Sequence, residues 1–158
     1  MDTSTLTKYV IKDNEVTYTR TFNAASDLVW EAWSKVEFLE KWFGPFGFSI
    51  TTQHFSFVEN GSWKFIMHGP DGTDFPNHIK FLKIVPIQMI EYKHVDDEDR
   101  EAISFSVTVS FESKGESTIL TMKHVFKTIE QLQYVAEHYG AIEGGQQTLA
   151  RLATLVEK

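Results

Sequence analysis

The C-terminal thirty residues carry the pattern that most constrains how this chain can fold. Apolar side chains recur at helical spacing over 128–157 and fall within an arc of roughly 160°, at about 100° per residue. Thr128 and Gln131 have the spacing of a capping box, which predicts the first turn. One unbroken helix over this range would be roughly 40 Å long. Such a helix needs a large apolar partner, and a whole sheet can supply it.

The preceding residues alternate between apolar and polar side chains, as half-buried strands do. The clearest run is Ile103 to Phe111, with every second residue apolar and serine or threonine between. Strands are expected at 15–22, 46–57, 62–69, 73–84, 87–95, 102–112 and 117–126. Two short helices are expected between the first two strands, and Asn60-Gly61 predicts a two-residue hairpin turn. The pattern predicts an α+β fold in which about seven antiparallel strands curve around the C-terminal helix.

Domain organisation follows from length and local composition. Residues 1–14 are polar and are expected to form a flexible N-terminus, with a single domain over 15–158. The charge run 96–101 lacks the spacing and glycine of a calcium loop, so it is expected to be a solvated hairpin loop.

Composition excludes several classes of function. The formal charge is −7 with no basic cluster, which argues against nucleic acid as a partner. No apolar run approaches the roughly 20 residues of a membrane-spanning helix, so no membrane insertion is expected. The chain has no cysteine, and the polar start Met1 to Lys8 lacks the apolar core of a signal peptide. These features predict a cytoplasmic protein.

The chemical motifs point away from a metal, a cofactor or an assigned catalytic residue. The six histidines include no pair at i, i+2 or i, i+4, so no metal site is expected: His54, His68, His78, His94, His124 and His138. Neither a glycine-rich phosphate loop nor the Gly-x-Ser-x-Gly nucleophile motif is present.

A set of inward-facing residues remains, in which a few polar groups interrupt an aromatic interior. A mostly apolar pocket with a few convergent polar groups is the usual form of a small-molecule site. Gly145 falls on the apolar face of the C-terminal helix, where it either leaves a cavity or receives a side chain from the sheet. The predicted ligand-binding residues are Trp63, Phe65, Met67, Tyr92, His94, Phe105, Val107, Met122, His124, His138, Ile142, Gly145 and Gln146.

Several short motifs resemble a known family when taken together. They are Arg20-Thr21-Phe22, Val29 to Trp33, Lys41 to Pro45, Asn60 to Trp63, Met67 to Gly72 and Gln147 to Leu152. Over about 15–158 the chain resembles bacterial proteins similar to the C-terminal domain of the activator of the 90-kDa heat-shock chaperone's ATPase. These belong to the START-like (SRPBCC) superfamily. The resemblance implies a helix-grip fold with a cavity between sheet and helix. Many relatives have a tryptophan where this chain has Gly145, which implies a wider or reshaped cavity.

Three functions remain open at the level of sequence. The preferred one is non-enzymatic binding of a small hydrophobic or aromatic molecule in the cavity. The second is a cyclase- or hydrolase-type enzyme that uses cavity histidines or Tyr92 as general acid or base. The third is a co-chaperone-like interaction module, which requires an exposed apolar patch, whereas the expected outer sheet face is polar. A weak homodimer is compatible with the sequence; a chaperone partner finds no support in it.

Overall fold

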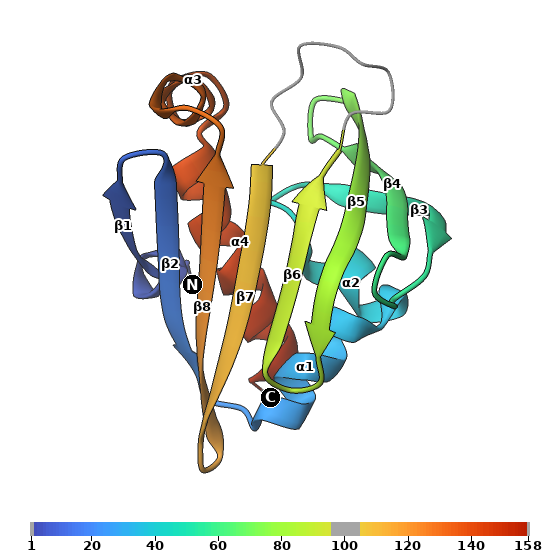
Figure 1. Cartoon of the computed structure of the whole chain (residues 1–158), viewed down its shortest axis with the longest axis vertical. Coiled ribbons are helices and arrows are strands. Elements are labelled where there is room, and N and C mark those ends of the chain that lie inside the picture. Colours follow the sequence, from blue (N-terminus) through green and yellow to red (C-terminus); the bar gives the residue numbers. More distant parts are fainter. Residues whose placement is uncertain (1, 96–104, 158) are drawn as a thin grey trace.

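A computed structural model describes residues 2–95 and 105–157, which form one curved sheet and the helices that cover it (Figure 1). The elements in chain order are η1 (Ser4–Leu6), β1 (Lys8–Lys12), β2 (Glu15–Phe22), α1 (Ser26–Ser34), α2 (Val36–Trp42), β3 (Ser49–Phe55), β4 (Ser62–His68), β5 (Asp74–Val85), β6 (Met89–His94), β7 (Phe105–Lys114), β8 (Ser117–Phe126), α3 (Ile129–Tyr139) and α4 (Ala141–Val156).

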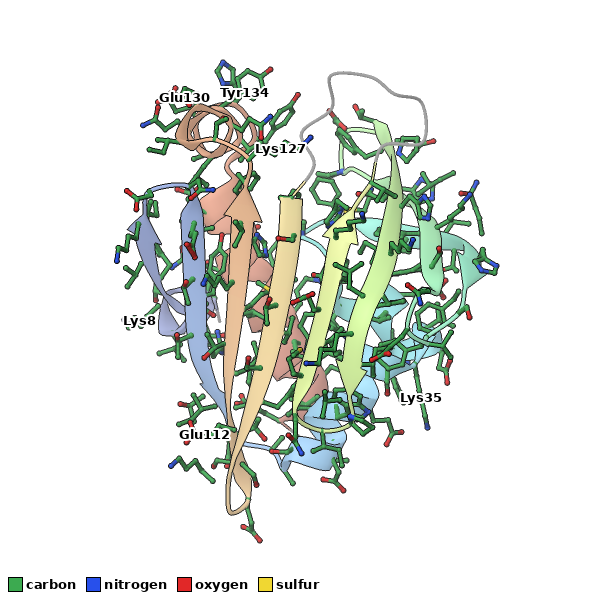
Figure 2. The ribbon with its side chains drawn as sticks, in the orientation of Figure 1. Lys8, Lys35, Glu112, Lys127, Glu130 and Tyr134 are labelled. Atoms are coloured by element: carbon green, nitrogen blue, oxygen red, sulfur yellow. The ribbon has the colours of Figure 1, made fainter. Side chains whose placement is uncertain are left out.

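All neighbouring strands of the sheet run antiparallel, in the order β1-β2-β8-β7-β6-β5-β4-β3. Helix α4 runs along one face of the sheet, with α1 and α2 beside its C-terminal half (Figure 1). The core between the layers contains Trp42, Trp63 and Phe65 together with Leu149 and Leu152 of α4, each at most 1% exposed. The charged side chains labelled in Figure 2 project outward from this core. The α+β helix-grip architecture expected from the sequence is confirmed.

The prediction of one unbroken C-terminal helix is wrong, because the chain turns at Gly140. This residue has φ 60° and ψ 39°, a left-handed conformation that ends α3, and α4 begins at the next residue. Glycine adopts this conformation without the steric cost that other residues incur. Helix α3 contacts the end of β8, whereas α4 stays on the sheet. The predicted cap is confirmed, since Thr128 Oγ1 accepts a hydrogen bond of 3.0 Å from the backbone N–H of Gln131.

The N-terminal residues form two elements that the sequence pattern did not predict, η1 and the edge strand β1, so the sheet has eight strands instead of seven. Arg20 explains why this segment is held in place. This residue is 3% exposed, and its guanidinium donates hydrogen bonds to the carbonyl and hydroxyl oxygens of Thr3 and to the hydroxyl of Thr7. An arginine on the apolar side of β2 is therefore the anchor of the first seven residues.

The remaining strand predictions are confirmed with changes at their ends, but the prediction of a two-residue hairpin turn at Asn60-Gly61 is wrong. The connection from β3 to β4 is longer than a two-residue turn and spans 56–61, with Asn60 at φ 69°. The predicted solvated loop 96–101 lies outside the described residues, as do residues 102–104 of the strand expected at 102–112. None of the helices in the described part of the chain is long and apolar enough to cross a membrane.

Candidate functional site

A cavity of about 330 Å³ lies between the concave face of the sheet and the N-terminal half of α4. Strands β4 to β8 supply one wall, and the turns of α4 that follow Gly140 supply the other. Tyr139 and Pro45 lie at its rim, where Tyr139 is 66% exposed. The volume falls within the usual range for small-molecule pockets, about 300–1,000 Å³.

The sheet wall of the cavity is aromatic because alternate residues of neighbouring strands point to the same side. The rings of His94 and Phe105 stack, with centroids 4.3 Å apart and planes inclined by 21°. His124 follows on the next strand, 5.3 Å from the ring of Phe105, and Tyr92 lies 6.0 Å from His94. Met122 continues the wall on β8. The strands thus place two imidazoles and one phenol on a mostly apolar surface.

These three polar side chains make no hydrogen bond with any other residue that the structure describes. Burial lowers the pKa of His94 to about 4. Burial and the neighbouring His94 together lower the pKa of His124 to about 3. Burial also raises the pKa of Tyr92 above its ordinary value. At neutral pH the wall therefore presents two uncharged imidazoles, each with one donor and one acceptor nitrogen, and a protonated phenol.

The opposite wall is held by side chains of α4 that bind the loop after α2. Arg151 donates hydrogen bonds of 2.9–3.1 Å to the carbonyl oxygens of Lys41, Gly44 and Pro45. Gln147 accepts a hydrogen bond from the backbone N–H of Phe46. Four bonds therefore fix the Gly44-Pro45 edge of the cavity to the helix.

Gly145 lines the cavity, but a sheet side chain packs against it. A Cβ atom at this position would lie 2.3 Å from Cζ of Tyr18, a separation that no real contact shows. The Tyr18 hydroxyl continues past the glycine and donates to the carbonyl of Ala141 at 3.2 Å. Of the two alternatives that the sequence left open, the packing of a sheet side chain on the glycine is the one found. The space beside this glycine is filled by Tyr18.

The predicted site residues fall into three groups. Seven line the cavity: Met67, Tyr92, His94, Phe105, Met122, His124 and Gly145. Four are buried core residues that are not among its described lining: Trp63, Phe65, Val107 and Ile142.

Two of the predicted residues point elsewhere, and for them the prediction of convergence is wrong. His138 is exposed on α3, where it stacks on Tyr134 and bonds to its carbonyl oxygen. Gln146 donates a hydrogen bond of 2.9 Å to the carbonyl of Thr7. Because the chain turns at Gly140, α3 carries His138 away from the cavity. The side chain of Gln146 is held by its hydrogen bond to the N-terminal segment, which the sequence pattern did not predict.

The sequence pattern missed the residues that form the rim and the helix wall. They are Phe43, Gly44, Pro45, Asn77, Tyr139, Gly140, Ala141, Gly144 and Thr148. Gly44-Pro45 was visible in the sequence as the end of a predicted helix, and the end of a helix is a place where a cavity can open. Asn77 and Thr148 carried no such signal.

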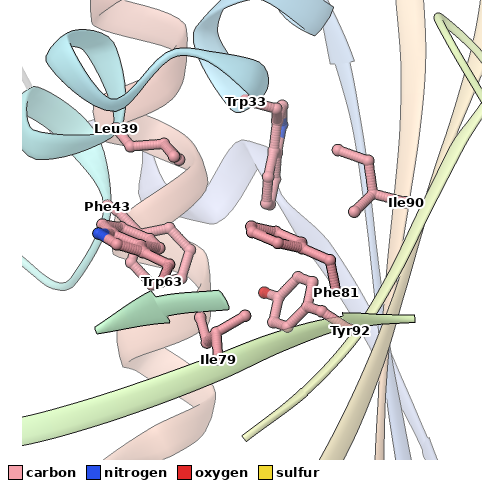
Figure 3. Close-up of a pocket in the computed structure, with 8 residues that line it drawn as sticks. All are labelled: Trp33, Leu39, Phe43, Trp63, Ile79, Phe81, Ile90 and Tyr92. Carbon is pink, nitrogen blue, oxygen red and sulfur yellow. The ribbon is translucent and has the colours of Figure 1, made fainter. Parts of the chain in front are cut away.

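A smaller void of about 10 Å³ lies deeper, under α1 and α2 (Figure 3). Rings of Trp33, Trp63 and Phe81 surround it, and Tyr92 separates it from the larger cavity. A single water needs about 10–15 Å³. This part of the core is therefore packed and has no room for a ligand.

No cluster of three or more His, Asp or Glu that could hold a metal ion occurs in 2–95 and 105–157. Thr51, His68 and Asp74 form a hydrogen-bonded row on the outer face of the sheet, with Thr51 Oγ1 2.8 Å from His68 Nε2 and His68 Nδ1 2.7 Å from Asp74 Oδ1. The row is solvent-exposed, so water competes for every polar contact that a reacting group would need.

Comparison with known proteins agrees with this architecture. The family model described as Activator of Hsp90 ATPase homolog 1-like protein matches residues 23–157. The chain belongs to this family. No curated protein matches it.

Solved structures place this Activator of Hsp90 ATPase homolog 1-like chain among bacterial relatives of the same fold. A protein from Arthrobacter aurescens is 24% identical, with a TM-score of 0.88 over 96% of this chain and 92% of its own. A protein from Staphylococcus epidermidis is 26% identical, with a TM-score of 0.81 over 95% and 93%. The AHSA1 protein from Silicibacter pomeroyi is 20% identical, with a TM-score of 0.72 over 90% and 97%. These likenesses support the fold and leave the ligand to be argued from the cavity.

Proposed function

We propose that this protein binds a small hydrophobic or aromatic molecule in the cavity between the sheet and α4. The observation that carries the proposal is the cavity itself: about 330 Å³, walled by aromatic rings and methionines, with polar groups of Tyr92, His94 and His124 that make no hydrogen bond to another described residue. Rings and thioethers attract apolar ligands, and a few polar groups orient them. Membership of a helix-grip family gives independent support.

Binding is proposed in preference to catalysis because of the state of the histidines. A general acid or base works best with a pKa near the working pH, and the cavity lowers the pKa of His94 to about 4 and that of His124 to about 3. Neutral imidazoles with such low basicity suit hydrogen bonding to a ligand better than proton transfer at neutral pH.

The experiment compares two threonines of α4 that differ in their relation to the cavity. Thr148 lines it, whereas Thr154 is exposed, and each hydroxyl donates to the carbonyl four residues earlier. Thr148→Phe is expected to fill the cavity, and Thr154→Phe loses the same type of bond without touching it. The readout is the rise in melting temperature caused by the hydrophobic probe 1-naphthol.

A hundredfold excess over the dissociation constant stabilises the native state by about 2.7 kcal/mol, which corresponds to roughly 5–10 °C for a domain of this size. Wild type and Thr154→Phe are expected to show this shift, and Thr148→Phe to lose most of it. No shift in the wild type, or equal shifts in both variants, contradicts the proposal.

A further inference from the structure

The lack of charged side chains in the described lining of the cavity limits the class of ligand that it can bind. This inference rests on the proposed function. None of the described residues that line the cavity is an Asp, Glu, Lys or Arg. An ion buried without a partner costs several kcal/mol or changes its protonation state. A ligand that carries a permanent charge would find no countercharge in the described wall.

The helix ends at the cavity do not supply the missing charge. An isolated helix N-terminus would attract an anion. The N-terminus of α4, however, is separated from the C-terminus of α3 by one residue. The positive end of one helix dipole thus lies beside the negative end of the other, with Gly140 between them. The carboxylate of Glu143, in the first turn of α4, lies 3.7 Å from where a Cβ of Gly140 would be. This carboxylate is negative and would repel an anion at this edge of the cavity.

The polar groups on the sheet wall are suited to hydrogen bonding with an uncharged ligand. His94 and His124 come from β6 and β8 and flank Phe105, and neither makes a hydrogen bond to another described residue. A neutral imidazole can accept from a hydroxyl or donate to a carbonyl. The near-parallel stack of His94 on Phe105 offers a flat face against which an aromatic ring can lie.

We propose that the cavity selects uncharged aromatic molecules with a hydroxyl or carbonyl group, and rejects their carboxylate and ammonium analogues. Selection rests on the lack of a countercharge among the described lining residues, around a neutral hydrogen-bonding wall. The rejected class includes aromatic acids, which a purely hydrophobic cavity of this size would accommodate by shape.

The test uses four naphthalenes of similar size and isothermal titration at about pH 7.5, where a carboxylate is ionised and an alkylamine is protonated. The neutral pair is 1-naphthol and methyl 1-naphthoate, and the charged pair is 1-naphthoate and 1-naphthylmethylammonium. Both neutral probes are expected to bind. Each charged probe is expected to bind more than about 30-fold more weakly. The ester shows that charge is rejected, since it is larger than the acid.

Failure of the inference and failure of the proposed function give different results. If all four probes bind within about threefold of one another, or if either charged probe binds best, the charge selection is wrong and hydrophobic binding stands. If none of the four binds, the proposed function is wrong and the inference falls with it.

The proposed hydrogen bond between the ligand and the imidazoles is tested with a probe of its own. 1-Methoxynaphthalene cannot donate, so it is expected to bind about five- to tenfold more weakly than 1-naphthol. This difference is expected to disappear in the His94→Phe/His124→Phe double variant and to persist in His54→Gln, which changes an exposed histidine of β3. Equal affinities of the two probes for the wild type would overturn the role assigned to the imidazoles.

Discussion

The ring of Tyr18 on β2 lies against the backbone of Gly145 on α4, so close that a Cβ at position 145 would be 2.3 Å from Cζ of the ring and 2.4 Å from its hydroxyl oxygen. The tyrosine is 1% exposed and its hydroxyl donates to Ala141. The ring therefore has little freedom to move. This contact sets how closely α4 approaches the sheet beside the cavity.

Gly145→Ala is expected to destabilise the protein by roughly 1–3 kcal/mol, because a methyl group would overpack a filled site. Gly144→Ala is the matched control. Its Cβ would be 3.4 Å from Cγ of Pro45, and alanine favours a helix over glycine by up to about 1 kcal/mol, so little net change is expected. Urea unfolding measures both free energies. Equal effects at the two positions would contradict the contact.

Shortening the opposing side chain provides a second check. In the Tyr18→Val background the overpacking is relieved, so Gly145→Ala is expected to cost at least about 1 kcal/mol less than it does in the wild type. Additive losses in a double-mutant cycle would show that Tyr18 does not limit position 145.

Arg20→Leu is expected to release the first seven residues from the sheet while the domain remains folded. The substitution removes charge-assisted hydrogen bonds to Thr3 and Thr7, each of which contributes about 1.5–3 kcal/mol net of exchange with water. The measurement is hydrogen exchange at the amides of Leu6 and Thr7, which bond to Thr3 and Ser4 in η1. Unchanged protection at these two amides would remove the anchoring role of Arg20.

Acid is expected to destabilise the protein through the two cavity histidines. Both bind a proton less readily in the folded protein than in the unfolded chain, where the pKa is about 6.5. Their contribution is therefore fully present above about pH 6.5. It is lost as the pH falls toward the folded pKa of about 4 for His94 and about 3 for His124. As the pH falls from about 7 to about 5, each histidine is expected to lower the free energy of unfolding by about 1–2 kcal/mol.

The pH profile of unfolding for His124→Phe and His94→Phe measures this effect. Each variant is expected to lose less stability than the wild type over the same range, and His54→Gln serves as the exposed control. Parallel profiles for all four proteins would show that these imidazoles are not shielded from solvent.

Strand pattern proved more informative than helix pattern in this chain. Inward residues of β4, β6, β7 and β8 could be assigned from alternation alone, because side chains on a strand change face at every residue. The cavity positions of Met67, Tyr92, Phe105 and Met122 follow from that rule. Local pattern was sufficient for these four residues, whereas Asn77 of β5, which also lines the cavity, carried no such signal.

The features that the sequence pattern missed depend on backbone conformation and on contacts between residues far apart in the chain. Apolar periodicity continues through Gly140, so only the left-handed backbone there reveals that α3 turns away and takes His138 with it. The occupant of the space beside Gly145 is a residue 127 positions earlier, and no local signal identifies Tyr18 as that residue. Gln146 bonds to Thr7 across a similar separation.

The central claim is that a ligand occupies the cavity between the sheet and α4, and methionine methyl groups report on it directly. The chain has four methionines; Met67 and Met122 line the cavity, whereas Met89 lies at an outward position of β6. In methyl spectra of protein labelled at methionine, saturating 1-naphthol is expected to shift the Met67 and Met122 signals and leave Met89 in place. A shift confined to Met89, or no change at any methionine while binding is detected by titration, would place the ligand elsewhere and contradict the account.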